Sequence, residues 1–132
     1  MNMTELKKAS IYIFFVSVIC FSCSERELGN GYYFLPKYEA IDVGYPEGEA
    51  IVYKSNKEYI FSNIRIRGDV LEVHADSEFI IAKRDPLISW ETNTGVLEYF
   101  IIIKKSDSVI GPLTKENFIL KTKKSDINLE FE

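Results

Sequence analysis

The stretch Tyr99–Ile103 is the feature that most limits how this chain can fold. It reads YFIII, five consecutive apolar or aromatic residues between Glu98 and Lys104. Side chains of a strand point alternately to the two faces of its sheet, so a strand of this composition buries both faces. We therefore expect a central strand in a sheet that is covered on both sides.

The segment 58–83 has the period-two pattern of half-buried strands. Gly68-Asp69 and Asp76-Ser77 interrupt the pattern with residues that are typical of tight turns. The pattern predicts a three-stranded antiparallel meander with strands at 58–67, 70–75 and 78–83.

Within the second of these strands, the alternation predicts one apolar face formed by Leu71, Val73 and Ala75. We also expect strands at 38–43, 50–54 and 109–110, a long loop over 84–95, and an edge strand over 127–132.

One helix is expected, and it begins after Thr114. This threonine can cap the first turn, while Leu113 and Phe118 have the spacing of a hydrophobic staple. Glu116 lies near the predicted start, and three lysines lie near the predicted end, which suits the helix dipole. The predicted fold class is mainly β (α+β): an antiparallel meander sheet with one short C-terminal helix.

The first residues of the chain do not read as domain sequence. Lys7 and Lys8 precede an uncharged run of 16 residues, 9–24. A spanning helix needs about 20 apolar residues. A shorter run after a positive segment is typical of a secretory signal peptide. The alternative is an amphipathic core helix, but the run lacks a polar face.

The two cysteines, Cys20 and Cys23, lie at the end of this run. A disulfide between them would close a very small loop. A structural zinc site needs about four ligands, and the chain has two cysteines and one histidine. Ser22 before Cys23 resembles the lipobox of bacterial lipoproteins, which implies cleavage before Cys23 and lipid attachment to it. We predict a signal peptide at 1–22, an anchor and tether at 23–35, and a β-rich domain at 36–132.

A wider resemblance includes this lipobox and the segment 77–118. The sequences DSEFIIAKRD and EYFIIIKKSDSVIGPLTKENF resemble a family of small uncharacterised bacterial lipoproteins, a domain of unknown function. The resemblance implies no catalytic residues. A serine directly after the cysteine, as at Ser24, resembles the pattern of lipoproteins that are sent to the outer membrane. This resemblance implies a lipid-anchored protein of the cell envelope, on the periplasmic or the surface face of that membrane.

Glu72, His74 and Asp76 alternate along one predicted strand. They would project from the same face, where they could bind a divalent metal or act in acid–base chemistry. We interpret them as the solvated face of a half-buried strand and expect no metal, no cofactor and no catalytic residue.

Trp90 lies in the predicted loop 84–95. An exposed aromatic residue in a loop can anchor a partner, so we regard Trp90 as a candidate for a binding loop. The alternative is that its ring folds back over the sheet.

The net charge of −4 argues against nucleic acid as a partner. Our leading hypothesis is a non-enzymatic lipoprotein, attached to the membrane through Cys23, that binds a protein or a ligand. One alternative is an immunity or inhibitor protein against a toxin, because an acidic surface attracts basic partners. The other is a hydrolase that uses His74.

Overall fold

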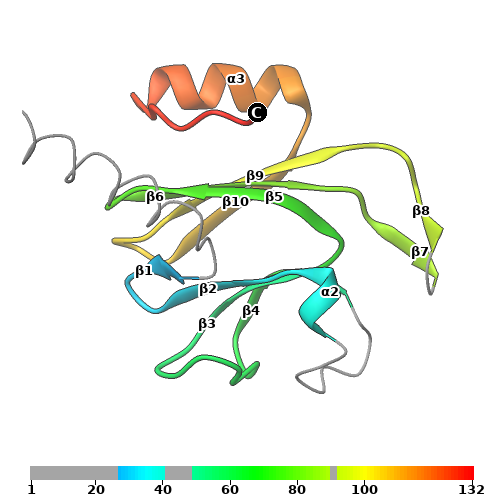
Figure 1. Ribbon diagram of the computed structural model, residues 1–132. Coiled ribbons are helices and arrows are strands. Elements are labelled where there is room, and N and C mark those ends of the chain that lie inside the picture. Colours follow the sequence, from blue (N-terminus) through cyan, green and yellow to red (C-terminus); the bar gives the residue numbers. More distant parts are fainter. Residues whose placement is uncertain (1–26, 41–48, 90–91) are drawn as a thin grey trace, which may run out of the picture.

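Residues 27–40, 49–89 and 92–132 are described by a computed structural model and form three layers (Figure 1). Two four-stranded antiparallel sheets pack against each other, and one helix covers the outer face of the second sheet. The predicted fold class, mainly β (α+β) with an antiparallel meander and one short C-terminal helix, is confirmed, although the strands form two main sheets where one was predicted.

The first sheet has the strand order β1-β2-β3-β4, which is also the order in the chain. Its strands are β1 (Glu27–Gly29), β2 (Tyr32–Leu35), β3 (Ile51–Lys54) and β4 (Ile64–Ile66). The four-residue helix α2 (Lys37–Ala40) follows β2. The strand expected at 50–54 is therefore confirmed as β3.

The second sheet has the order β10-β9-β6-β5 and is a second antiparallel meander. Its strands are β5 (Val70–Ala75), β6 (Phe79–Arg84), β9 (Glu98–Ile103) and β10 (Ser108–Leu113). A small hairpin of β7 (Leu87–Ser89) and β8 (Thr92–Asn93) projects from one end of this sheet in Figure 1.

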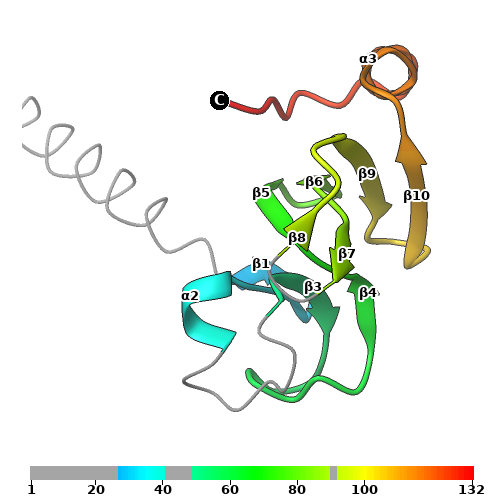
Figure 2. The same ribbon diagram turned by 90° about the vertical axis from the view of Figure 1, so that its right-hand side faces the viewer.

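The helix α3 (Lys115–Lys124) lies on β9 and β10. Thr114 is its N-cap, and its side-chain oxygen accepts a hydrogen bond of 3.2 Å from the backbone N–H of Asn117. Leu113 and Phe118 belong to the same apolar cluster. The helix and its cap are as predicted. Figure 2 shows the chain after α3 returning across the sheet toward β5 and β6.

The largest core lies between the two sheets. The first sheet and its flanks contribute Leu28, Tyr32, Ala50, Val52 and Ile66, and the second contributes Val70, Val73, Ile80, Ala82, Phe100 and Ile102. On the other face of β9, Tyr99 and Ile101 are buried against Phe118 of α3. The prediction that the central strand is covered on both faces is confirmed.

Gly68-Asp69 does not form the predicted hairpin turn. β4 pairs with β3 and β5 pairs with β6, so the chain passes from one sheet to the other at this point. Asp69 is 3% exposed, and its carboxylate accepts hydrogen bonds from the backbone N–H of Ala50 at 3.2 Å and from the amine of Lys37 at 3.0 Å. The predicted three-stranded meander is therefore wrong at its first turn, because these residues serve a crossover.

The predicted apolar face of β5 is also wrong at one position. The strand register shifts between Val70 and Glu72, and this irregularity leaves Leu71 51% exposed. Val70 and Val73 are buried in its place. A bulge of this kind adds a residue to one strand and turns the alternation to the other face.

Three further expectations on the outline of the chain are corrected. The segment 38–40 belongs to α2 instead of a strand, and 41–43 lies outside the described residues. Pro36 precedes α2, and its carbonyl accepts a hydrogen bond from the N–H of Glu39 at 3.1 Å, which closes a helical turn. The predicted loop 84–95 contains β7 and β8, and the returning strand is longer than 109–110.

The folded domain begins earlier in the chain than predicted. Residues 27–35, assigned to the anchor and tether, form β1 and β2, and they bury Leu28, Tyr32 and Leu35. The folded domain thus includes residues from Glu27 onward, where we had expected it to begin at 36. Within the described parts of the chain, no helix has the length and apolar composition needed to cross a membrane.

A charged cluster connects the two sheets at Asp107, in the turn between β9 and β10. Its carboxylate accepts hydrogen bonds from Arg65 Nε of β4 at 2.9 Å and from the hydroxyl of Tyr32 of β2 at 2.5 Å. The hydrogen bond from Arg65 is the main reason that the pKa of Asp107 is lowered from 3.8 to about 2, although burial opposes the shift. Lys54 of β3 adds a cation 3.9 Å away.

We predict that Gly68→Ala lowers the free energy of unfolding by about 2–3 kcal/mol, because overpacking of a filled site has this cost. A Cβ atom at this position would lie 2.6 Å from the Cβ atom of Glu49. Gly95→Ala is the control, since no atom lies within 4 Å there and only the backbone strain at φ +81° remains, about 1 kcal/mol. Denaturant unfolding measures both, and equal losses would contradict the crowding.

We predict that Asp107→Asn lowers stability at pH 6 by about 1–2 kcal/mol, through loss of hydrogen bonds to a charged acceptor. Because the pKa is lower in the folded state, the carboxylate stabilises the fold above pH 3.8 and this contribution disappears as the pH falls toward 2. Unfolding curves of both proteins should therefore converge between pH 4 and pH 2.

Asp126→Asn is the matched control for this comparison. Asp126 also lies in a turn with positive φ, 58° against 54° for Asp107, and asparagine tolerates this conformation. The control should track the wild type over the whole pH range. A gap between wild type and Asp107→Asn that stays constant down to pH 2 would refute the assigned role of the carboxylate.

Candidate functional site

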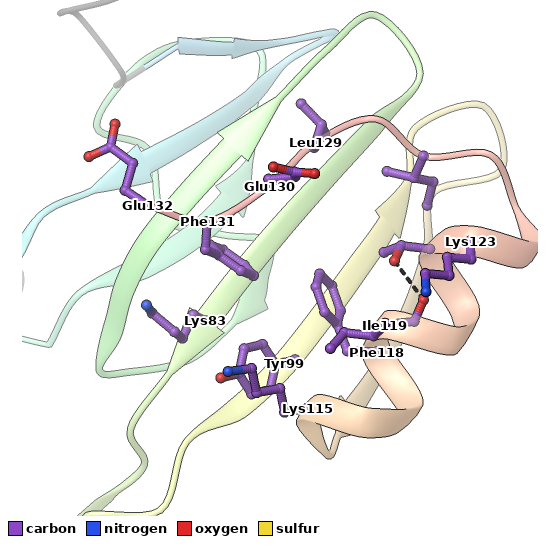
Figure 3. Close-up of a pocket in the computed structure, with 12 residues that line it drawn as sticks. Lys83, Tyr99, Lys115, Phe118, Ile119, Lys123, Leu129, Glu130, Phe131 and Glu132 are labelled. Carbon is purple, nitrogen blue, oxygen red and sulfur yellow. Dashed lines mark hydrogen bonds between the residues drawn. The ribbon is translucent and has the colours of Figure 1, made fainter.

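A half-open groove lies on the outer face of the second sheet, between α3 and the segment that follows it (Figure 3). Its volume is about 430 Å³. The apolar part of its lining consists of Tyr99, Phe118, Ile119, Ile127, Leu129 and Phe131. Cavities of about 300–1,000 Å³ with mostly apolar walls and a few placed polar groups are typical of small-molecule sites.

The segment 125–132, which we call the tail, forms one wall of the groove. The chain turns after α3 through hydrogen bonds from Ser125 N to the carbonyl of Lys121 at 3.0 Å and from Ile127 N to that of Thr122 at 2.9 Å. Beyond the turn, Ile127, Leu129 and Phe131 alternate with polar residues and pack on the sheet. Residues 127–132 of this tail were predicted to form an edge strand. That prediction is wrong, because its alternating side chains cover the face of the sheet instead.

Three aromatic rings form the floor of the groove. The ring centroids of Tyr99 and Phe118 are 5.2 Å apart in a stacked arrangement, and those of Phe118 and Phe131 are 5.4 Å apart. Tyr99 and Phe131 are 5.9 Å apart. Each of the three comes from a different part of the chain: β9, α3 and the tail. The floor therefore exists only when helix and tail are both in place.

Glu72 of β5 fixes the far end of the tail. Its carboxylate accepts a hydrogen bond of 2.8 Å from the backbone N–H of Glu132, lies 2.6 Å from His74 Nε2, and lies 3.2 Å from the amine of Lys83. Burial alone would raise the pKa of Glu72. The hydrogen bonds from Glu132, His74 and Lys83 outweigh it and hold the pKa below its ordinary value of 4.5.

The three residues singled out on this strand do not form one site. Glu72 and His74 meet, and the His74 ring lies 5.9 Å from that of Phe131. Asp76 points elsewhere: its carboxylate accepts hydrogen bonds from the N–H groups of Glu78 and Phe79 and caps the turn before β6. Over residues 27–40, 49–89 and 92–132, no cluster of three or more His, Cys, Asp or Glu side chains could hold a metal ion.

Polar donors gather at one end of the groove. Figure 3 shows the amine of Lys115 and the hydroxyl of Tyr99 at this end, with Lys83 beside them. Tyr99 is only 7% exposed, and its hydroxyl has no hydrogen-bond partner in the described part of the protein. Lys115 likewise has no ion pair with any described residue. Lys83 also contacts the floor, since its amine lies 5.3 Å from the centroid of Phe131.

Sequence reasoning did not find these residues. Tyr99 is part of the buried YFIII run and reads as core, and Lys115 reads as an ordinary residue of the first helical turn. The alternation of Ile127, Leu129 and Phe131 was the one signal that pointed to the tail. The other candidates, Trp90 and Cys23, lie outside the described residues.

A family model described as a protein of unknown function, DUF3997, matches residues 31–132. No curated protein and no solved structure matches the chain.

We predict that Glu72→Gln loosens the tail and lowers the melting temperature at pH 7 by several degrees, because a charged acceptor of three groups becomes neutral. Since the folded pKa is below 4.5, the carboxylate contributes above that pH and ceases to contribute as the pH falls below it. The difference in melting temperature should thus shrink between pH 5 and pH 3.

Hydrogen exchange tests the same variant locally. The amides of Ile127 and Glu132, the two that donate hydrogen bonds at the ends of 127–132, should exchange faster in Glu72→Gln than in the wild type, while those of β9 keep their protection. Glu78→Gln is the control, because this glutamate is exposed and has no side-chain partner among the described residues. Unchanged exchange in the tail of Glu72→Gln would show that the carboxylate does not hold it.

Proposed function

The chain belongs to DUF3997, a family of proteins of unknown function, and from this premise we propose that it is a lipid-anchored, non-enzymatic binding module of the cell envelope. The groove under α3 carries this proposal. It is a formed cavity with an aromatic floor and with polar donors at one end, of which Tyr99 and Lys115 have no partner in the described protein.

The anchor is the part of the proposal that the sequence supports. Lys7, Lys8 and the uncharged run 9–24 have the features of an export signal, and Ser22 precedes the cysteine that would carry the lipid. The family match begins at residue 31, after this segment. A leader and an anchor would therefore lie outside the part of the chain that the family shares.

A short tether would follow from this arrangement. Three residues, 24–26, separate Cys23 from Glu27, the first residue of β1, so four Cα–Cα steps join the two. An extended chain of that length reaches at most about 14 Å. β1 belongs to the first sheet, and α3 lies on the opposite side of the second sheet (Figure 1). A domain tethered at β1 would thus leave the groove open to the surroundings.

Binding fits the contacts of His74 better than catalysis does. The imidazole contacts the carboxylate of Glu72, and its ring lies 5.9 Å from that of Phe131, both of which hold the tail. Ser24 after the cysteine supports the outer membrane as the final location, on its periplasmic or surface face. A protein partner at Trp90 is compatible with the same anchored position.

We predict that the wild type and Cys20→Ala incorporate labelled palmitate in cells and fractionate with membranes. Cys23→Ala should lose the label, because no other thiol would remain beside Ser22. Cys20→Ala is the matched control, since it removes a cysteine three residues away. Labelled Cys23→Ala protein, or an unlabelled wild type that retains residues 1–22, would rule out the lipid anchor.

A further inference from the structure

We propose that the groove binds a single-chain amphipathic anion, such as a fatty acid. Its acidic group would lie at the end marked by Tyr99 and Lys115, and its hydrocarbon chain along Phe118 and Phe131. The inference rests on the proposed binding function and names the class of ligand for that groove.

The hydroxyl of Tyr99 is the first observation that points to a ligand. This hydroxyl is not among the buried side-chain atoms that lack a partner, so it faces the open groove while the rest of the residue is buried. The Tyr99 side chain lines the groove and is 7% exposed, yet its hydroxyl has no partner in the described protein. A carboxylate oxygen bound at this end of the groove would accept its hydrogen bond.

Charge supports an acidic group at the same end. Lys115 is the first residue of α3, so its amine and the positive end of the helix dipole lie together. Lys83 supplies a second amine, which lies 3.2 Å from the carboxylate of Glu72. Figure 3 shows Glu130 and Glu132 along the opposite rim, away from Lys115. The groove therefore favours one orientation of an anion.

The remaining lining suits a hydrocarbon chain. Phe118 and Phe131 form a continuous floor with ring centroids 5.4 Å apart, and Ile119, although 40% exposed, lines the wall beside them. The volume of about 430 Å³ lies in the range of small-molecule cavities. In this part of the groove a ligand could contribute little except apolar surface, so binding should depend strongly on chain length.

The experiment uses the full-length protein in phosphatidylcholine nanodiscs and a dodecanoate that carries a photoactivatable group at its chain end. After irradiation and digestion, mass spectrometry should locate the label on peptides of α3 and of the tail. Unlabelled octanoate, decanoate and dodecanoate should compete with affinities that rise about tenfold for each two methylene groups. Dodecanol, which lacks the charge, should compete at least tenfold less well than dodecanoate.

Neighbouring residues on α3 supply matched controls. Lys115→Gln and Tyr99→Phe should each weaken labelling about tenfold, whereas Lys121→Gln, on the same helix but outside the groove, should not. Ile119→Gln should weaken it, whereas Leu120→Gln, which is 66% exposed and outside the groove, should not. All five variants keep the floor of the groove in place.

Several results would overturn the inference: no label in α3 or the tail, equal labelling of Lys115→Gln and Lys121→Gln, or equal competition by dodecanol and dodecanoate. Competition by nanodiscs that contain lysophosphatidylglycerol, an anionic membrane lipid with a single chain, would support the shared chemistry and identify a membrane lipid as the source, and its absence would identify the free acid. The anchor is judged separately by palmitate on Cys23, so either proposal can fail while the other stands.

Discussion

The central strands β6 and β9 bury side chains on both faces, so their sheet needs a layer on each side. The first sheet provides one layer. The other consists of a ten-residue helix over β9 and β10 together with the tail over β5 and β6. One helix of this length is too narrow to cover four strands, since helices pack about 8–10 Å from their neighbours and strands are spaced about 4.8 Å apart. The groove is the part of the sheet that lies between the two covering segments.

Polar contacts fix the two sheets relative to each other. Asp107, at the β9–β10 turn of the second sheet, holds Arg65 and Tyr32 of the first sheet. Asp69 at the crossover accepts hydrogen bonds from Ala50 beside β3, Lys37 of α2 and Asn93 of β8. The amine of Lys104 donates to the carbonyls of Leu28 and Asp76. Burial lowers the pKa of Lys104, because removal from water disfavours the charged form of the amine. Apolar contacts alone would allow the two sheets to slide over each other. The hydrogen bonds and ion pairs form only when the sheets have one particular relative position. They therefore specify how β1, next to the proposed tether, is attached to the rest of the domain.

The local elements of the fold could be read from the sequence, and their partners could not. The cap at Thr114 and the doubly buried strand at Tyr99–Ile103 depend on neighbouring residues alone, and both were found. Gly68-Asp69 has the chemistry of a hairpin turn, but the same small and acidic pair also suits a crossover whose carboxylate is buried. Leu71 was placed on the wrong face because a bulge reverses the alternation of buried and exposed side chains, and no residue type in the sequence indicates that bulge.

The site shows the same limit. Glu72, His74 and Asp76 were expected to share the polar face of one strand. The role of Glu72 and His74 depends on a segment some sixty residues later, whose last described amide contacts Glu72. Tyr99 was recognised as buried, but the missing partner of its hydroxyl becomes visible only when the packing of α3 and the tail is known. A pattern of period two predicts which side chains of the tail are covered. It does not distinguish a strand at the edge of a sheet from a segment lying across its face.

The way in which the tail is held has a consequence for binding. Its described backbone contacts lie at its ends, at Ser125–Ile127 and at Glu132, and the part between them is held by Leu129 and Phe131. Segments with few backbone hydrogen bonds open at lower free energy than the strands beneath them. A ligand that fills the space between Phe118 and Phe131 would contact both covering segments and stabilise the closed form by mass action. The segment that completes the sheet's cover is therefore also the one best able to admit a ligand, while the sandwich beneath it stays fixed.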